Sequence, residues 1–287
     1  MKINTETKLI GLIGYPLGHS FSPLMQNAAF ERYLLNKIYI PIEVSPENLE
    51  TVVKGISKMN FDGFNVTIPY KIDIIKYLDE IDEYAKCIGA VNTVSIKNGV
   101  LKGYNTDGIG FLKSYKQNTG TKIEGKKVFV LGSGGASRAV SMTLALDKAD
   151  KIYICNRTYE KALALSNDIN EKVGECSVAV PFFHEDMKTA IDDSDILINT
   201  TNVGMFPNID FSPIDKDLLN EKLTVCDVVY NPKKTKLLQE AEEIGCETVF
   251  GLSMLLYQGA EAFEIWTEKK APVDLMLKIL EDGLKEN

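Results

Sequence analysis

The chain has 287 residues, of which 45% are hydrophobic and 25% charged, and its formal net charge is −8 at pH 7. This length is enough for two domains of ordinary size, and the composition is that of a globular protein in water. The negative balance argues against broad nucleic-acid binding, and we expect neither a membrane span nor a signal peptide because no apolar segment has the required pattern.

The first part of the chain is predicted to alternate strands with helices. Residues 8–14 and 38–44 read as strands, and residues 24–35 as a helix whose start is marked by Ser22 and the proline after it. Capping this helix is the simplest role for Ser22. Ser20 has no such explanation, and two hydroxyls beside a helix N-terminus can also hold a carboxylate.

Polar side chains follow at the end of the next strand. The alternation in residues 64–68 predicts a strand on which Asn65 and Thr67 point the same way. Lys71 follows at the start of a helix predicted to run toward residue 78. The helix dipole disfavours a lysine there, although a lysine at the surface tolerates that position easily.

A β-hairpin is predicted next, because Asn98 and Gly99 form the strongest short signal for a tight turn between strands. Asn92 precedes the first arm, and Asp107 follows the second. Asp107 is either a helix cap or part of a cleft where the first domain leads into the second. With Asn65, Thr67 and Lys71, these side chains are of the kind that hydrogen-bond a polyol.

The centre of the chain predicts a nucleotide-binding turn. The apolar run 128–131 is typical of a buried parallel strand, and it leads through a glycine-rich turn, residues 132–135, into a helix ending near residue 146. Such a turn lets the backbone and the helix N–H groups approach a pyrophosphate. Ser137 replaces the third glycine of G-x-G-x-x-G, so a plain tight turn is the alternative.

The following strand indicates which cofactor is bound. Residues 151–156 form a second apolar strand, and it ends in Asn156, Arg157 and Thr158, with no acid before Glu160. An acid at this point would bond the ribose 2′-hydroxyl of NAD, whereas an arginine favours the extra phosphate of NADP. We therefore predict NADP.

The strand–helix alternation then continues to the end of the second domain. Strands are predicted over residues 177–183, 195–201, 223–230 and 247–250, and helices over residues 159–173 and 235–244. The loop after residue 199 would meet the cofactor at the strand ends. Two final helices, from residue 251 through 266 and from 272 to 284, have no strand after them and are predicted to pack back on the first domain.

The five cysteines have no C-x-x-C spacing, and only His19 and His184 could join them as metal ligands, so we expect no metal site. Cys155 and Cys226 lie within apolar strand patterns, where cysteine is a small core residue more often than a nucleophile. This usage fits a reducing cytoplasm.

Several separated motifs together resemble those of the shikimate dehydrogenase family, over nearly the whole chain. In order, they are G-x-P-x-x-H-S-x-S-P at 14–23, N-V-T-I-P-Y-K at 65–71, G-A-V-N-T at 89–93, N-T-D-G at 105–108, G-S-G-G-A-S-R-A at 132–139, N-R-T at 156–158 and Q-G at 258–259. The resemblance implies a two-domain α/β protein, with a substrate domain at 1–106, a Rossmann-type NADP domain at 107–251, and helices at 252–287 returning to the first domain.

The resemblance also implies roles for individual residues. The carboxylate of shikimate would be bound by Ser20 and Ser22 with Thr67 and Tyr230 nearby, and its ring hydroxyls by Asn92, Asp107 and Gln258. Lys71 would be the general acid/base, assisted by Asp107. The cofactor-binding set would be Gly132, Ser133, Gly134, Gly135, Ala136, Asn156, Arg157, Thr158, Lys161, Thr200, Val228, Gly251 and Met254. The segment 199–202 departs from the family's usual N-A/T-T/S-x-x-G-M form.

Three alternatives differ in chemistry. A quinate/shikimate dehydrogenase using NAD would need an acid where Arg157 stands, and a folate-type methylene dehydrogenase would lack the serine pair and the N-T-D-G motif. A regulator that binds nucleotide without catalysis would have lost Lys71 or Asp107, and both are present. The sequence is compatible with a monomer or a homodimer.

Overall fold

The structure, a computed structural model, describes residues 3–18 and 20–285, so His19 of the first motif lies outside the described residues. Contacts divide the chain into two compact units. Unit 1 runs up to Thr106 and resumes at Leu256, and unit 2 runs from Asp107 to Leu255. The second break therefore lies inside a helix, a few residues after the position at which the sequence analysis placed it.

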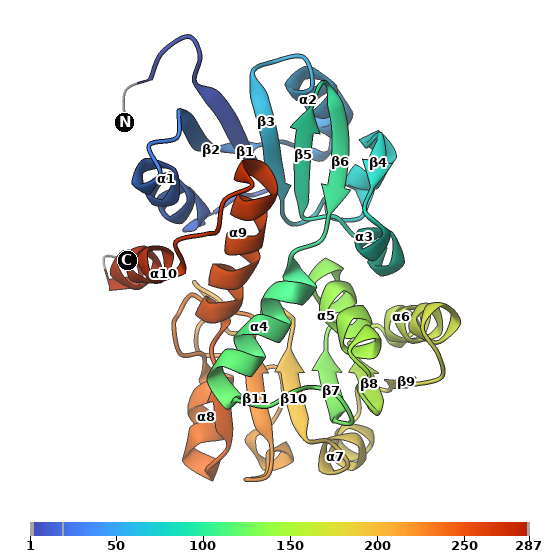
Figure 1. Cartoon of the computed structure of the whole chain (residues 1–287). Coiled ribbons are helices and arrows are strands. Elements are labelled where there is room, and N and C mark those ends of the chain that lie inside the picture. The colour runs from blue at the N-terminus through green and yellow to red at the C-terminus, as the bar shows by residue number, and fades with distance from the viewer. Residues whose placement is uncertain (1–2, 19, 286–287) are drawn as a thin grey trace. The chain divides into compact units, whose positions relative to one another are not determined.

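Unit 1 contains a mixed six-stranded sheet with the strand order β2-β1-β3-β5-β6-β4 (Figure 1). The carboxyl ends of β1, β3 and β6 and the amino end of β5 share one edge, because β1 and β3 run parallel while β5 is antiparallel to both of its neighbours. The bounds are β1 Lys8–Gly14, β2 Lys37–Glu43, β3 Phe61–Val66, β4 Glu80–Ile81, β5 Thr93–Lys97 and β6 Val100–Tyr104.

The predicted hairpin is confirmed. β5 and β6 pair in antiparallel register with Lys97 opposite Val100. The two residues between them, Asn98 and Gly99, have φ of 54° and 79°. Both values lie in the left-handed region that a two-residue hairpin turn requires, and asparagine and glycine adopt it at the least cost.

Three short elements of unit 1 differ from the prediction. The helix expected from Lys71 is a turn followed by a 3₁₀ helix, η2, and the short α3 and β4 were not predicted. Elements of two to six residues carry too little periodicity to be recognised. The bounds are α1 Ser22–Arg32, η1 Pro46–Asn48, α2 Leu49–Ile56, η2 Asp73–Tyr77, α3 Glu83–Ile88 and α10 Val273–Lys285, with α9 (Gly251–Thr267) entering unit 1 at Leu256.

Unit 2 is a Rossmann-type unit with a parallel six-stranded sheet in the order β12-β11-β10-β7-β8-β9. From β7 the chain moves outward to β8 and β9, and it then returns to β10 on the other side of β7. The bounds are β7 Lys127–Leu131, β8 Lys151–Cys155, β9 Ser177–Val180, β10 Ile196–Asn199, β11 Thr224–Asp227 and β12 Glu247–Val249. The predicted α/β architecture is confirmed.

Helices pack along this sheet. α5 covers β7 and β8, and α6 covers β8 and β9 (Figure 1). The bounds are α4 Asp107–Thr119, α5 Gly135–Leu146, α6 Tyr159–Lys172, α7 His184–Asp192, η3 Lys216–Leu218 and α8 Lys236–Ile244. α7 and η3 were not predicted. Within the described chain, no helix combines the length and the apolar character needed to cross a bilayer.

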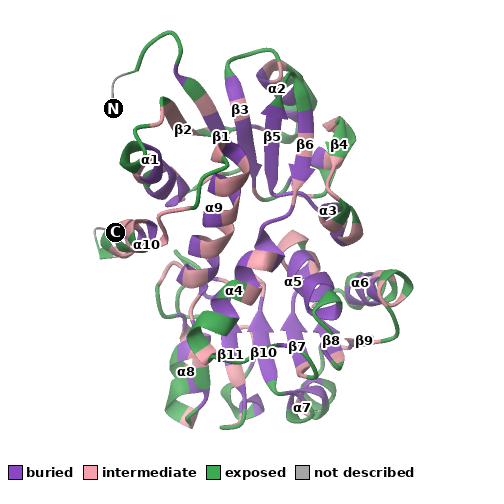
Figure 2. Ribbon diagram, in the orientation of Figure 1, coloured by how far each residue is buried: buried purple, intermediate pink, exposed green. Residues whose placement is uncertain are grey.

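The inner strands of both sheets are buried along most of their length, purple in Figure 2: β1, β3 and β5 in unit 1, and β7, β8 and β10 in unit 2. In unit 1, the part of α9 after Leu255 is fixed to the sheet by Trp266, whose indole N–H donates to the Val94 carbonyl at 3.0 Å. The indole reaches this carbonyl because Gly63, on the neighbouring strand β3, has no side chain. A Cβ at Gly63 would overlap both the carbonyl oxygen of Val94 and the indole of Trp266.

Replacing Gly63 with alanine should therefore lower the free energy of unfolding by about 2 kcal/mol, as expected for overpacking against backbone. Gly55→Ala is the matched control, because Gly55 lies in α2 and its added Cβ would meet only the end of the Met59 side chain at 3.9 Å. That change should range from neutral to a gain of about 1 kcal/mol. Chemical denaturation of both variants tests this, and equal effects would contradict it.

Candidate active site

The serine pair lies where β1 leads into α1. α1 begins at Ser22, and its N-cap residue, Phe21, makes no side-chain capping bond. The hydroxyl of Ser20 instead accepts the backbone N–H of Ser22 at 3.3 Å. The prediction that Ser22 caps this helix is therefore wrong. The serine that bonds a backbone N–H at the helix start is Ser20.

The buried Ser22 side chain lies near the hydroxyl of Tyr39 on β2. Tyr39 in turn donates to Oδ1 of Asn65 at 2.8 Å. Burial raises the pKa of the Tyr39 phenol well above its ordinary value, and the nearby Ser22 hydroxyl opposes this only in part. Tyr39 therefore stays protonated near neutral pH, and its contact with Asn65 was not predicted.

Asn65 and Asn92, two predicted substrate residues, are brought together by the edge of the sheet. The amide nitrogen of Asn65 donates to the Asn92 carbonyl at 3.0 Å and to the Thr93 hydroxyl at 2.9 Å. Oδ1 of Asn92 accepts the backbone N–H of Thr106 at 2.8 Å, and its Nδ2 donates to the Thr106 hydroxyl at 2.9 Å. All four residues are buried, so this polar cluster is a fixed part of unit 1.

Thr67 and Lys71 occupy the turn that follows β3. The backbone N–H of Thr67 donates to the Ile13 carbonyl at 2.8 Å, which holds the turn against the end of β1. The Lys71 carbonyl accepts the N–H of Val91 at 2.7 Å, which holds the other end beside the segment before β5. The half-buried Lys71 is thus positioned by backbone bonds at the same edge of the sheet as the serines.

Gln258 lies on α9, within unit 1. The next residue, Gly259, lies against α1, because its Cβ position would overlap the end of the Met25 side chain. Its carbonyl accepts the side-chain N–H of Gln26 at 2.8 Å. Gln258 is therefore carried by the part of α9 that touches the helix beginning at Ser22.

In unit 2, the predicted nucleotide turn follows β7. Gly132 has φ of 112°, and a Cβ there would come to 2.7 Å from the Thr200 hydroxyl. Ser137, which replaces the third glycine, is buried and donates to the Gly132 carbonyl at 2.7 Å, so it closes the turn. Gly134 precedes α5, and a Cβ there would meet nothing within 4 Å. The turn thus leaves open space before the unpaired N–H groups of a helix.

The loop after β8 adjoins this turn, because the N–H of Gly132 donates to the Cys155 carbonyl at 2.8 Å. Asn156 donates from its side chain to the Thr158 carbonyl at 3.0 Å, which fixes the loop before α6. Arg157, Thr158 and Lys161 are exposed there. The two loops lie at the carboxyl ends of neighbouring strands, as the sequence analysis expected.

Asp227, at the end of β11, joins the loops on the other side of β7. It is only 3% exposed, and it accepts bonds from the Asn199 amide at 3.0 Å, the Val229 N–H at 2.9 Å and the Thr235 hydroxyl at 2.7 Å. Asn199 in turn accepts the N–H and hydroxyl of Thr201 at 3.0 and 2.7 Å. The sequence analysis missed Asp227, although an acid ending an apolar strand is a visible signal.

The remaining predicted residues lie around this network. Thr200 donates its hydroxyl to the Leu131 carbonyl at 2.5 Å, beside the Gly132 turn. Val228 and Tyr230 follow β11, and a Cβ on Gly251 would come to 2.6 Å from the Val228 carbonyl oxygen. Met254 is buried in α9, and Asp107 is the buried first residue of α4. Unit 2 therefore contains Asp107, Tyr230 and the predicted cofactor residues, and unit 1 contains the other substrate residues.

The five cysteines are free thiols. Cys155 and Cys226 are fully buried in the sheet of unit 2, as expected for core residues. Burial raises the pKa of Cys155 to about 12 and raises that of Cys226 as well, so both are protonated and poor nucleophiles near neutral pH.

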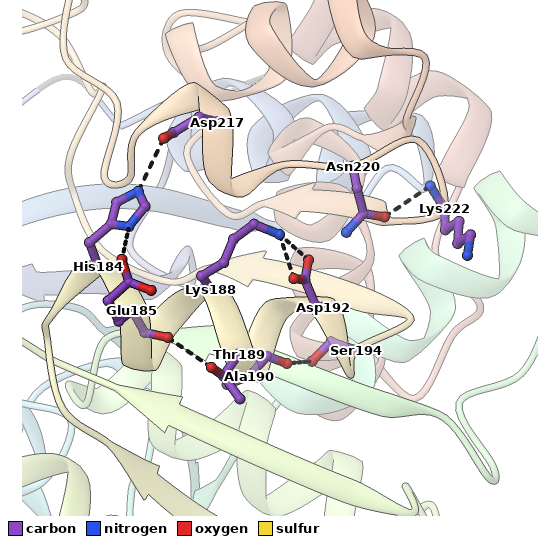
Figure 3. Close-up of polar contacts among 10 residues, drawn as sticks. All are labelled: His184, Glu185, Lys188, Thr189, Ala190, Asp192, Ser194, Asp217, Asn220 and Lys222. Atoms are coloured by element: carbon purple, nitrogen blue, oxygen red, sulfur yellow. Dashed lines mark hydrogen bonds and ion pairs between the residues drawn. The ribbon is translucent and has the colours of Figure 1, made fainter.

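One group of possible metal ligands occurs in the described part of the chain. Ligand atoms of His184, Asp215 and Asp217 lie within 4.8 Å of one another, and all three residues are exposed. His184 lies between Asp217 at 3.2 Å and Glu185 at 3.8 Å, and Lys188 pairs with Asp192 along α7 (Figure 3). Exposed acidic groups such as these commonly lie together without binding an ion.

The buried Asp227 predicts a specific pH dependence of stability. Burial raises the pKa of its carboxyl from 3.8 to about 7, although the three hydrogen bonds oppose the shift. The folded state therefore holds the proton of Asp227 more tightly than the unfolded state does. The contribution of this carboxyl to the free energy of unfolding is at its full value below about pH 4, and it is lost as the pH rises through about 7. Between pH 5 and pH 8, the free energy of unfolding of the parent chain should fall by about 3 kcal/mol relative to that of Asp227→Asn, because asparagine does not titrate. Urea denaturation at both pH values measures this, and parallel curves would contradict it.

Three family profiles match the chain. One described as the shikimate dehydrogenase substrate binding domain matches residues 12–94, and one described as shikimate / quinate 5-dehydrogenase matches residues 114–206. A third, described as the shikimate 5'-dehydrogenase C-terminal domain, matches residues 251–281. These segments follow the order of the two units along the chain.

Individual proteins match over almost the full length. The shikimate dehydrogenase (NADP(+)) of Methanobrevibacter smithii is 49% identical, covering 98% of this chain and 99% of its own. A crystal structure of shikimate dehydrogenase in complex with NADP+ has a TM-score of 0.92 at 45% identity, covering 99% of this chain and 98% of its own. The Listeria monocytogenes shikimate 5-dehydrogenase in complex with shikimate and NAD has a TM-score of 0.89 at 43% identity, covering 98% of both chains. The chain therefore belongs to the shikimate dehydrogenase family.

Proposed function

We propose that this chain is an NADP-dependent shikimate dehydrogenase, which reversibly reduces 3-dehydroshikimate to shikimate in the biosynthesis of chorismate and the aromatic amino acids. The observation that carries the proposal is that the residues for substrate and those for cofactor occur together in one member of this family. Unit 1 presents the serines and Lys71 at one edge of its sheet, and unit 2 presents an open glycine turn beside a loop that carries Arg157. No acid follows β8 before Glu160.

The substrate has one carboxylate and several ring hydroxyls. We assign the carboxylate to Ser20 and Ser22, with Thr67 and Tyr230 nearby, because hydroxyls donate to a group that only accepts. The ring hydroxyls both donate and accept, and they suit carboxamides and a carboxylate. We assign them to Asn65, Asn92, Asp107 and Gln258.

The residues of unit 2 fit a dinucleotide. The open space at Gly134 and the N-terminus of α5 suit a pyrophosphate, because helix N–H groups and the helix dipole both favour an anion there. Exposed Arg157 and Lys161 add positive charge beside it, where a 2′-phosphate would need it. The cofactor set assigned here is Gly132, Ser133, Gly134, Gly135, Ala136, Asn156, Arg157, Thr158, Lys161, Thr200, Val228, Gly251 and Met254.

The cofactor, when bound, supplies or accepts the hydride. The chain's own task is to orient the substrate and to manage one proton. As the carbonyl of 3-dehydroshikimate is reduced, negative charge grows on its oxygen, and the Lys71 ammonium stabilises that charge and donates the proton. Asp107 assists Lys71 in this transfer. In the oxidative direction the same groups take the proton back.

We further propose that the protein works in the cytoplasm as a monomer or a homodimer. The five free thiols support a reducing compartment, because cysteines in oxidising compartments are commonly paired.

Arg157→Ala should weaken the binding of NADP by about 1.5–3 kcal/mol, the value of a charge-assisted hydrogen bond. The binding of NAD should change much less. The measurement is the absorbance of the reduced nicotinamide with shikimate and either cofactor. Arg32→Ala, at an exposed position at the end of α1, is the matched control and should alter neither Michaelis constant. Equal losses of affinity for both cofactors would contradict the assignment of Arg157 to the 2′-phosphate. If the parent chain did not turn over shikimate at all, the proposed function itself would be refuted.

Lys71→Ala should lower turnover roughly 10²–10⁴-fold with a smaller effect on substrate binding, as expected for loss of a proton donor. Asp107→Ala should approach the same loss, and the double variant should be little worse, because groups acting as a unit are not additive. Lys76→Ala is the control, since exposed Lys76 pairs with Asp73 at 2.8 Å on the adjacent helix η2. Turnover with both reactants saturating decides this, and additive losses would mean independent roles.

A further inference from the structure

Unit 1 contains a cleft at the edge of its sheet opposite to the serine loop and the Lys71 turn. Lys8 begins β1, Asp62 is the second residue of β3, and Lys97 ends β5, which runs antiparallel to β3. The cleft between these strand ends and the end of α9 has a volume of about 600 Å³. This volume is in the range of clefts that hold small molecules. The described residues that line it include none of those proposed to bind substrate or cofactor.

Ser95 is the residue of this cleft that points to a ligand. Its side chain lines the cleft, although the residue is only 3% exposed. Across the described residues, its hydroxyl has no hydrogen-bond partner. Thr93, two residues earlier and therefore on the same face of β5, is satisfied by Asn65 at 2.9 Å. A hydroxyl as buried as that of Ser95 needs a partner, and the cleft is the side from which one can come.

The charges around the cleft leave one lysine for a ligand. Lys37 pairs with Asp62. Lys97 pairs with Glu268 at 2.6 Å. The ammonium of Lys8 lies 3.8 Å from Asp62, which is beyond hydrogen-bond distance. Among the described residues it makes no hydrogen bond, so all of its N–H groups are available to an acceptor. The cleft therefore offers a positive charge on a chain whose net charge is −8.

Apolar side chains form the rest of the lining. Trp266 and Phe61 are buried residues whose side chains reach the cleft, and Met59 is an exposed one. The indole of Trp266 is held in place by its bond to the Val94 carbonyl at 3.0 Å. A methionine adapts its shape to a neighbour and contacts aromatic rings favourably. A fixed ring opposite an adaptable side chain suits a flat apolar group.

We propose that this cleft binds a small organic anion with one carboxylate and a flat apolar body. The carboxylate accepts from the Lys8 ammonium and the Ser95 hydroxyl, because both donate and a carboxylate only accepts. The strands that carry these two residues flank β3, so their backbones are about 10 Å apart, and the flexible stem of lysine spans the difference. The apolar body packs against Trp266, Phe61 and Met59. The inference is independent of the proposed function, because the cleft shares no residue with the proposed active site.

The chain contains a single tryptophan, so the fluorescence of Trp266 reports on this cleft alone. The probe is phenylpropionate, and phenylpropanol is its control, because it has the same apolar body without the carboxylate. Phenylpropionate should change the emission of Trp266 saturably, in the millimolar range expected of so small a ligand. Phenylpropanol should bind at least about tenfold more weakly. A constant excess of shikimate should leave the titration unchanged.

Two variants test the donors. Lys8→Met and Ser95→Ala should each weaken the binding of phenylpropionate about tenfold, the value of one hydrogen bond to a charged group. Ser95→Ala should not lower the melting temperature, because its hydroxyl has no protein partner to lose. Lys126→Met is the matched control and should bind the probe normally. The Lys126 ammonium lies 3.9 Å from Asp195 in unit 2, and 40% of its side chain is exposed, compared with 46% for Lys8.

Four results would each overturn the proposal. The first is the absence of saturable binding of phenylpropionate by both fluorescence and calorimetry. The second is equal binding of phenylpropanol, which would mean that the carboxylate is not recognised. The third is displacement of the probe by shikimate, which would place it in the proposed active site instead. The last is an affinity that stays unchanged in Lys8→Met and Ser95→Ala, or that falls equally in Lys126→Met.

Discussion

A buried polar group needs a hydrogen-bond partner, and in both units this requirement fixes the ends of the strands next to the proposed site residues. In unit 1, the Asn65 carboxamide bonds the start of β5 and the hydroxyl of Tyr39 on β2. In unit 2, the Asp227 carboxyl bonds the end of β10 and the first residues after β11. Each side chain is almost inaccessible to water, so its partners cannot move away without leaving a costly unpaired group.

Each sheet also brings proposed site residues from distant parts of the sequence to one of its edges. In unit 2, the strand order reverses between β7 and β10, and the glycine turn after β7 faces Thr200 after β10. Loops diverge at such a point and leave room for a ligand. In unit 1, the serine loop and the Lys71 turn follow two adjacent parallel strands, which places both at one edge.

Features that depend on neighbours in sequence were predictable. The Asn98-Gly99 turn, the glycine turn after β7 and most strands and longer helices follow from local propensity and periodicity. Features that depend on long-range contacts were not. Tyr39 looks like any aromatic in a strand, yet its hydroxyl donates to Asn65 on a different strand. Asp227 likewise accepts a bond from Asn199 on the neighbouring strand. Tertiary contact decided the role of both.

Unit 1 is interrupted by the whole of unit 2, because the chain leaves it after Thr106 and returns only at Leu256. During synthesis on a ribosome, all the residues of unit 2 emerge before the indole of Trp266 can reach the Val94 carbonyl. Domains tend to fold as units as they emerge. The part of unit 1 that is made first therefore lacks two sets of contacts until synthesis is nearly complete: the bond from Trp266 of α9 to β5, and the packing of α10 on α1.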